Sequence, residues 1–189
     1  MITSAEMKTY ISKAGGTMKK IYIISGPAGA GKSTIAKRLS EQFDHSAYIE
    51  GDVISDMVIG GYRPPWECEE SLALTWENIA DVSINFIQAN KTVVIDYVAF
   101  PEEVEAFSQK VYAEVKDALI FYVVLRVEKG ELLRRDALRI KEHRMGTRCL
   151  ELADEFESKG IDERFLYDTT NLDIPAILLN IKENPGFKY

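Results

Sequence analysis

A glycine-rich segment near the N-terminus combines residue types that bind phosphate. It comprises Gly26, Pro27, Ala28, Gly29, Ala30, Gly31, Lys32, Ser33 and Thr34, and it fits the pattern G-x-x-x-x-G-K-[ST]. Glycines let successive backbone N–H groups point toward phosphate oxygens. We expect Lys32 to reach the β- and γ-phosphates, Ser33 to ligate Mg²⁺ and Thr34 to meet the α-phosphate. The segment therefore predicts binding of ATP with Mg²⁺.

The residues on either side of this segment supply the strand and the helix that such a loop requires. Residues 21–24 are β-branched or aromatic, which is typical of a strand buried on both faces of a parallel sheet. Ile35, Ala36 and Leu39 form the apolar face of a helix, whose N-terminus attracts anions. A glycine-rich turn that carries Lys-Ser by chance would require neither the strand before it nor the helix after it, so their presence favours a phosphate-binding loop.

Two aspartates follow predicted strands and are candidates for the chemistry. Asp96 comes within the apolar run 92–98, where a carboxylate holds Mg²⁺ or its water, although it could also cap a loop. Asp52 follows the short strand 47–50 and could accept the proton of a hydroxyl acceptor, or cap the helix that starts at Val53. A carboxylate beside Mg²⁺ is a poor proton acceptor. We therefore assign Asp96 to the metal and Asp52 to the acceptor.

A basic segment stands out in a protein whose formal net charge is −7. Between residues 126 and 148 there are eight basic side chains and four acidic ones. Arginines stabilise the charge of a transferring phosphoryl group, and the candidates for this role are Arg135, Arg139 and Arg144. A solvated charged face is the alternative.

Composition bounds the class of protein. The chain of 189 residues suits one domain, expected at 18–189 and preceded by an N-terminal arm at 1–17. We expect a cytoplasmic protein without a membrane span, with Cys68 and Cys149 as reduced thiols. The acidic net charge argues against general nucleic-acid binding. A monomer and a weak homodimer both stay open.

The remaining pattern alternates strands and helices. Helices are expected at 67–90, from Pro101 onward, and at 131–140, 148–159 and 174–183, with strands at 118–127 and 165–168. This alternation predicts an α/β protein with a parallel sheet covered on both faces and with ligands at the carboxyl ends of its strands.

Several short motifs together resemble the small P-loop kinases, a group that includes gluconate and shikimate kinases, chloramphenicol phosphotransferases and zeta-toxin-like kinases. These motifs are the phosphate loop, Gly51-Asp52, Val-Val-Ile-Asp96, Arg134-Arg135-Asp136 with Arg139, and Asp168-Thr-Thr-Asn171. The resemblance implies a three-layer P-loop NTPase fold, with a five-stranded parallel sheet in the order 2-3-1-4-5. It also implies an arginine-bearing lid at about 134–148, and it places Asp168, Thr169 and Asn171 beside the adenine.

The sequence departs from two of these kinases. Gluconate kinases carry a histidine-rich stretch where this chain has 53–59, and shikimate kinases have two acidic residues where it has only Asp52. We expect an ATP- and Mg²⁺-dependent phosphotransferase whose acceptor is a small-molecule hydroxyl. Tyr62, Arg63 and Trp66 are candidates for its pocket, although a Pro-Pro-Trp turn is as often plain packing.

Two other functions stay open at this point. One is a nucleoside or nucleotide kinase, and the other is an ATP-binding switch or ATPase that acts on a protein partner. A cluster of arginines in the same chain and a pocket-facing acid favour closure over a small acceptor.

Overall fold

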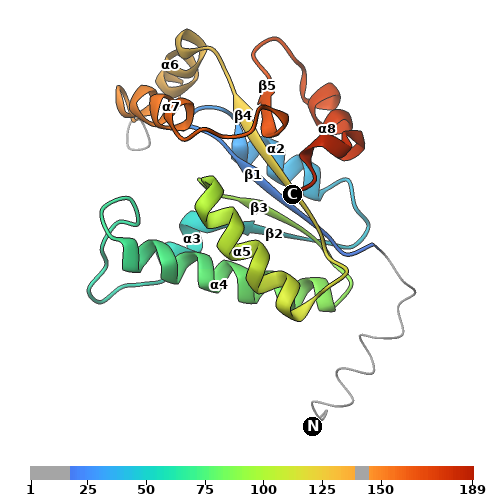
Figure 1. Ribbon diagram of the computed structural model, residues 1–189. Helices are drawn as coiled ribbons and strands as arrows, with labels where there is room; N and C mark the ends of the chain where they lie inside the picture. The colour runs from blue at the N-terminus through green and yellow to red at the C-terminus, as the bar shows by residue number, and fades with distance from the viewer. Residues whose placement is uncertain (1–17, 139–144) are drawn as a thin grey trace.

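The computed structural model describes residues 18–138 and 145–189 (Figure 1). The predicted N-terminal arm and the predicted lid residues Arg139 and Arg144 lie outside the described residues. Within the described part of the chain, no helix is both long and apolar enough to cross a membrane.

A five-stranded parallel sheet forms the centre of the protein, in the order β2-β3-β1-β4-β5. The strands are β1 (Lys20–Ser25), β2 (Ser46–Glu50), β3 (Thr92–Asp96), β4 (Leu119–Arg126) and β5 (Leu166–Asp168). The inner strands β1, β3 and β4 are buried on both faces, which explains their continuous apolar runs. The predicted fold class and strand order are confirmed.

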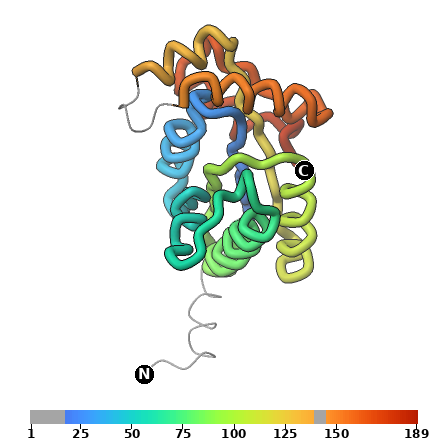
Figure 2. Tube along the Cα trace, turned by 90° about the vertical axis from the view of Figure 1, so that its left-hand side faces the viewer, coloured from blue at the N-terminus to red at the C-terminus, as the bar shows by residue number. Residues whose placement is uncertain are grey.

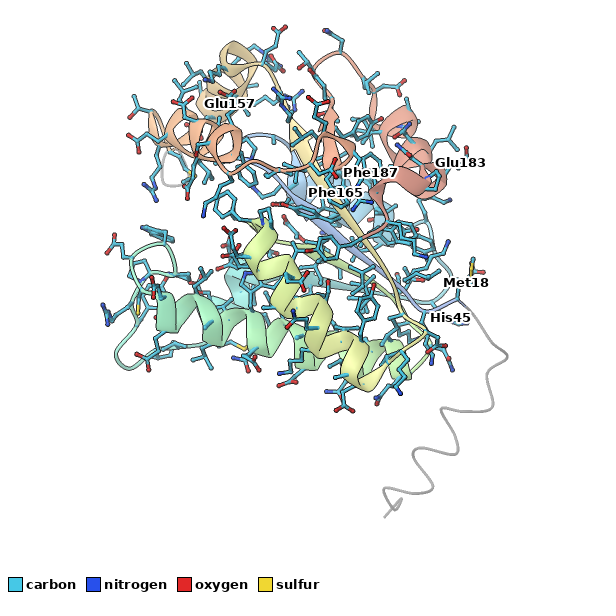
Figure 3. All side chains as sticks on the ribbon, viewed as in Figure 1. Met18, His45, Glu157, Phe165, Glu183 and Phe187 are labelled. Carbon is cyan, nitrogen blue, oxygen red and sulfur yellow. The ribbon has the colours of Figure 1, made fainter. Side chains whose placement is uncertain are left out.

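Helices cover both faces of the sheet, which gives three layers (Figure 1). One face is covered by α2 (Lys32–Ser40) and α8 (Ile174–Glu183), and the other by α4 (Glu69–Gln88) and α5 (Pro101–Glu114). Their buried side chains form two apolar clusters, one on each side of the sheet. Phe165 and Phe187, labelled in Figure 3, belong one to each cluster.

Shorter elements gather at the carboxyl end of the sheet. They are α3 (Gly51–Ser55) after β2, then α6 (Lys129–Ala137) and α7 (Arg148–Ser158) between β4 and β5. In Figure 2, α6 and α7 lie above, and α3 with the start of α4 lies below. The short 3₁₀ turns η2 (Glu163–Phe165) and η3 (Pro185–Phe187) complete the chain.

Most predicted elements have the expected bounds, and α3 is the informative exception. It begins at Gly51, with Glu50 in the N-cap position, and no side chain caps it. Asp52 therefore lies inside the first turn. The alternative that Asp52 caps a helix starting at Val53 is wrong, because the turn has already started when the chain reaches this carboxylate.

Candidate active site

The phosphate loop joins β1 to α2 in a conformation that needs its glycines. Gly26, Gly29 and Gly31 have φ values of 132°, 85° and 97°. A Cβ on Gly26 would lie 2.4 Å from the carbonyl oxygen of Leu125, so the backbones of β1 and β4 could not approach as they do. Glycine at these positions is therefore required for the observed shape of the loop.

Lys32 lies over this loop. Its ammonium group donates hydrogen bonds to the carbonyl oxygens of Gly26 (2.9 Å) and Pro27 (3.2 Å). Gly31, the N-cap residue of α2, has no side chain to cap the helix. The N–H groups of the first turn therefore remain available to a bound anion, and the helix dipole also attracts one, as a phosphate site requires. Lys32, Ser33 and Thr34 together open this helix.

Asp96 ends β3 next to β1, where its backbone is in register with Ile24. It is only 5% exposed, and one carboxylate oxygen accepts a 3.0 Å hydrogen bond from the Tyr48 hydroxyl. Sequence reasoning missed Tyr48, because nothing in the β2 pattern distinguishes a tyrosine that bonds across the sheet from one that only packs. The bond fixes Asp96 at the carboxyl edge.

Ser33 and Asp96 are suitable ligands for Mg²⁺. Hydroxyl and carboxylate oxygens are the donors that Mg²⁺ prefers, and the ion usually takes few protein ligands in addition to phosphate oxygens. Residues 18–138 and 145–189 contain no cluster of three or more His, Cys, Asp or Glu that could hold a metal alone. Ser33 and Asp96 therefore fit an Mg²⁺ ion that also binds the phosphates of a nucleotide.

Asp52 shares an electrostatic environment with the phosphate loop and with Asp96. Burial raises the pKa of Asp52, Lys32 lowers it, and the nearby charges of Asp96 and Asp56 raise it again. The three groups Lys32, Asp52 and Asp96 come from three different elements, so only the folded sheet brings them within reach of one another. The balance leaves Asp52 easier to protonate than an ordinary aspartate.

Tyr97 fixes the position of α3. A Cβ on Gly51 would lie 2.3 Å from the Tyr97 ring, so glycine alone allows this contact. The loop that begins with Tyr97 is held in turn, because Ala99 N–H donates to Ser25 Oγ (2.9 Å) and the Tyr122 hydroxyl donates to Ala99 O (2.8 Å). Asp52 is thereby tied to the end of β1, where the phosphate loop starts.

A cavity of about 190 Å³ lies one helical turn from Asp52, between α3, the loop after it and the start of α4. Tyr62 and Arg63, two of the three candidate acceptor residues, line it together with Ser55. Trp66, the third, is not among the lining residues and is 64% exposed. Its ring instead packs under the Arg148 guanidinium at 5.7 Å, where α7 begins.

The described part of the predicted lid places one arginine on the phosphate loop. Arg135 donates to the Ala30 carbonyl oxygen at 3.4 Å and to Glu131 at 2.8 Å. Arg134 also pairs with Glu131, at 2.6 Å, but its side chain is mostly exposed. These two cations hold the pKa of the Glu131 carboxyl down to about 2. Glu131, which we did not select from the sequence, orients Arg135.

Asp136 joins the two described ends of the lid. It is 3% exposed and accepts hydrogen bonds from the N–H groups of Met145 and Gly146, the latter at 2.8 Å. Sequence reasoning included Asp136 in a motif but assigned no role to it.

The loop after β5 is held against the start of α6. Thr170 N–H donates to Asp168 at 2.9 Å, which lowers the pKa of this carboxyl, and Thr170 Oγ1 accepts from Glu128 N–H. Thr169 is buried and donates to the Arg126 carbonyl, whereas Asn171 is exposed. A second cavity of about 500 Å³ reaches from Pro27 to Asp168 beneath α6 and α7.

A family model described as an AAA domain matches residues 23–159, which include the phosphate loop, α3, Asp96 and both lid helices. The chain belongs to this AAA domain family. No curated protein sequence matches it significantly.

Solved structures of two kinases and of an antibiotic resistance protein share the fold of this AAA domain at low identity. APS kinase CysC of Mycobacterium tuberculosis, in complex with AMPPNP and APS, has a TM-score of 0.60 at 17% identity over 87% of this chain and 95% of that chain. A gluconokinase of Sinorhizobium meliloti 1021 has a TM-score of 0.56 at 16% identity, over 88% and 91%. The tunicamycin resistance protein of Deinococcus radiodurans has 0.58 at 18%, over 86% and 92%. The predicted resemblance to small P-loop kinases is confirmed at the level of fold.

Proposed function

We propose that this AAA domain is an ATP- and Mg²⁺-dependent phosphotransferase that moves the γ-phosphoryl group to a hydroxyl of a small molecule. The observation that carries the proposal is the placement of Lys32, Asp52 and Asp96 beyond or at the carboxyl ends of the neighbouring strands β1, β2 and β3. A proton acceptor, a phosphate-binding cation and a metal ligand thus meet at the carboxyl edge of the sheet. A nucleotide-binding switch needs the last two groups but has no use for the first.

Each group has a role in the transfer. The phosphate loop and Lys32 bind the phosphates of ATP, and Mg²⁺, held by Ser33 and Asp96, supplies positive charge beside them. Asp52 orients the acceptor hydroxyl and takes its proton. The acceptor oxygen then bonds to the γ-phosphorus while the bond from that phosphorus to the β,γ-bridging oxygen breaks, which releases ADP.

The lid and the loop after β5 complete the donor side. Arg135 already touches the loop at Ala30, so it is placed to stabilise negative charge on the transferring group, and we assign Arg139 and Arg144 to the same task. We place the adenine beside Asp168, Thr169 and Asn171, because hydrogen bonds fix that loop next to the lid.

Lys32→Ala tests the donor half of this proposal. We expect phosphoryl transfer to fall by at least about 10²-fold, because the variant loses a preorganised charge over the phosphates. The thermal stability should change little. ATP-Mg binding is measured by calorimetry, with Lys37→Ala on the exposed part of α2 as the control. Unchanged ATP-Mg binding in both Lys32→Ala and Ser33→Ala would contradict nucleotide binding at this loop.

The acceptor half is tested by ADP release with and without pools of small hydroxyl compounds. A kinase releases ADP slowly in the absence of its acceptor and faster in its presence. ATP turnover that no hydroxyl compound changes, but that a protein fraction stimulates, would instead support a switch or ATPase with a protein partner.

A further inference from the structure

The three segments that carry the site leave the sheet side by side. The pairing of β2 with β3 and of β3 with β1 ends at residues that lie opposite one another, Glu50, Asp96 and Ile24. Gly51, Tyr97 and Ser25 come next in the chain, so they form a row at the carboxyl edge. The phosphate loop starts after Ser25, and Asp52 follows Gly51. Tyr97 is the middle member of this row.

The side chain of Tyr97 fills the space beside Gly51. A Cβ on Gly51 would lie 2.3 Å from Cγ and 2.7 Å from Cβ of Tyr97. Since the Cβ of Tyr97 is fixed by the backbone, rotation of the ring could not make room for a larger residue at position 51. The φ angle of Gly51 is not positive, so its backbone conformation does not require glycine. The packing on Tyr97 is what requires it.

Tyr97 is itself held in place by both of its neighbours in the fold. Its N–H donates to the Ile24 carbonyl oxygen at 3.4 Å, and its ring lies 5.6 Å from that of Trp76 on α4. Two residues further on, Ser25 Oγ donates to Ala99 O at 3.0 Å and accepts from Ala99 N–H at 2.9 Å. The support beside Gly51 is thus anchored to the strand that leads into the phosphate loop.

Helix α3 has few other contacts that could fix its position. It is five residues long, no side chain caps its start, and only Gly51 and Ser55 are buried in it. Ile54 is partly buried against the core. A helix of this length is not stable by itself in water. The place of its first turn, and with it the place of Asp52, therefore depends on the contact between Gly51 and Tyr97.

We infer that Tyr97 is a positioning residue for phosphoryl transfer, because its contact with Gly51 sets where Asp52 stands relative to the phosphate loop. The inference rests on the proposed function, in which Asp52 takes the proton of the acceptor. A displacement of about 1 Å can lower a rate by about 10²-fold. Loss of the Tyr97 ring should therefore impair the transfer and leave ATP-Mg binding intact.

The first test compares two buried aromatic residues that pack against the same Trp76 ring. Tyr97→Leu removes the ring beside Gly51, and Phe107→Leu removes a ring 5.8 Å from Trp76 on α5. Both should lower the melting temperature. ADP release is measured at saturating ATP with the pool of hydroxyl compounds that accelerates the wild-type protein most. Only Tyr97→Leu should lower it, by about 10²-fold, with an unchanged ATP-Mg dissociation constant. Tyr97→Phe keeps the ring and should restore the rate.

The second test changes the other side of the contact. Gly51→Ala introduces a Cβ that collides with Tyr97, whereas Gly60→Ala, in the loop after α3, places its Cβ where no atom lies within 4 Å. We expect Gly51→Ala to lower ADP release with the same pool at least as much as Tyr97→Leu, and Gly60→Ala to match the wild type. If Gly51→Ala does not fold, the comparison of Tyr97→Leu with Phe107→Leu decides.

Three results would overturn the inference. One is acceleration by the pool in Tyr97→Leu that equals that of the wild type. Another is a loss in Tyr97→Phe as large as that in Tyr97→Leu, which would implicate the hydroxyl instead of the packing. The third is weaker ATP-Mg binding in Tyr97→Leu that accounts for the whole loss, since Tyr97 would then support the metal ligand Asp96. Failure of the proposed function is seen separately, in the wild-type protein, if no pool accelerates ADP release.

Discussion

Two parts of the molecule face each other across the carboxyl edge of the sheet and differ in how they use charge. In the lid, α6 and α7 carry cations held by neighbouring carboxylates: Glu131 holds Arg134 and Arg135, and Lys129 pairs with Asp154 and Glu157. The acceptor flap is the segment 51–75, which comprises α3, the loop after it and the first part of α4. Its acids form no ion pair within the described residues; they are Asp52, Asp56, Glu67, Glu69 and Glu70. Ion pairs hold the cations of the lid helices in place, whereas the acids of the flap outnumber its basic residues and form no ion pairs.

The difference follows from what each part must do. A transferring phosphoryl group is stabilised best by charges that are already in position, because they need no reorganisation during the reaction. A proton acceptor such as Asp52 instead works best when its pKa is raised toward the working pH, which burial achieves first and the charges of Asp96 and Asp56 increase further. The Arg148 guanidinium over the Trp66 ring is one contact between the two parts.

The largest expected effect comes from removing the proton acceptor. Asp52→Asn should lower turnover by about 10²–10⁴-fold, the usual contribution of a general base, and change ATP-Mg affinity little. Steady-state kinetics and calorimetry measure the two quantities. Asp56→Asn, at the C-cap of the same helix, is the control and should retain most activity. Weakened ATP-Mg binding with preserved turnover at saturation would mean that Asp52 serves the metal.

The lid prediction compares two adjacent arginines that share one carboxylate. Arg135→Ala should lower turnover by about 10²-fold with a smaller change in ATP affinity, because its contact strengthens in the transition state. Arg134→Ala loses the same kind of ion pair but no contact with the phosphate loop, so its turnover should stay near that of the wild type. Equal losses of turnover in the two variants would mean that the packing of α6 causes the effect. Full activity in both would mean that these arginines form a solvated charged face.

The pH dependence of turnover reports on the flap. Asp52 must be ionised to accept a proton, so turnover should fall about tenfold per pH unit below its pKa, which lies above that of an ordinary aspartate. Asp56→Asn removes a charge that raises this pKa and should move the acidic limb to lower pH. The plateau should not change. A limb that stays in place would show that another group controls it.

The same pKa predicts a stability effect with a definite sign. Because folding raises the pKa of Asp52, the ionised carboxylate is destabilising in the folded state at neutral pH. Asp52→Asn should therefore raise the melting temperature at pH 7, and the gain should disappear as the pH falls below about 3.9, where both states are protonated. A variant that melts earlier at pH 7 would point to a structural role.

The smallest expected effect tests the partner of Asp96. Tyr48→Phe removes the hydrogen bond to this carboxylate and should weaken Mg²⁺ binding in the presence of nucleotide by about 10-fold, with little change in the KM of the acceptor. Tyr22→Phe is the matched control, because its buried hydroxyl has no hydrogen-bond partner within the described residues. Calorimetric titration of Mg²⁺ distinguishes them. Identical behaviour of both variants would remove Tyr48 from the site.

Local patterns were enough to predict nearly all of the elements. The apolar runs of β1, β3 and β4 are continuous because these strands are covered on both faces, and helix stripes such as Val104, Phe107 and Val111 recur at helical spacing for a similar reason. The strand order came from the resemblance of several short motifs to known kinases. The start of α3 could not be placed, because the packing of Gly51 on Tyr97 fixes it and the two residues are distant in sequence.

The sequence by itself determined the phosphate loop, because glycine conformations, the lysine and the helix start are all local to residues 26–34. It also determined the excess of basic residues in the predicted lid at 134–148 and the excess of acidic residues at 51–75, because each is a sum over nearby residues. Only the tertiary structure decided that Tyr48 holds Asp96, that Arg135 reaches Ala30, and that Trp66 faces Arg148. These pairs come from separate elements, and their meeting depends on strand order and register. Hydrophobic patterns say which face of an element is buried, but not which element will lie beside it.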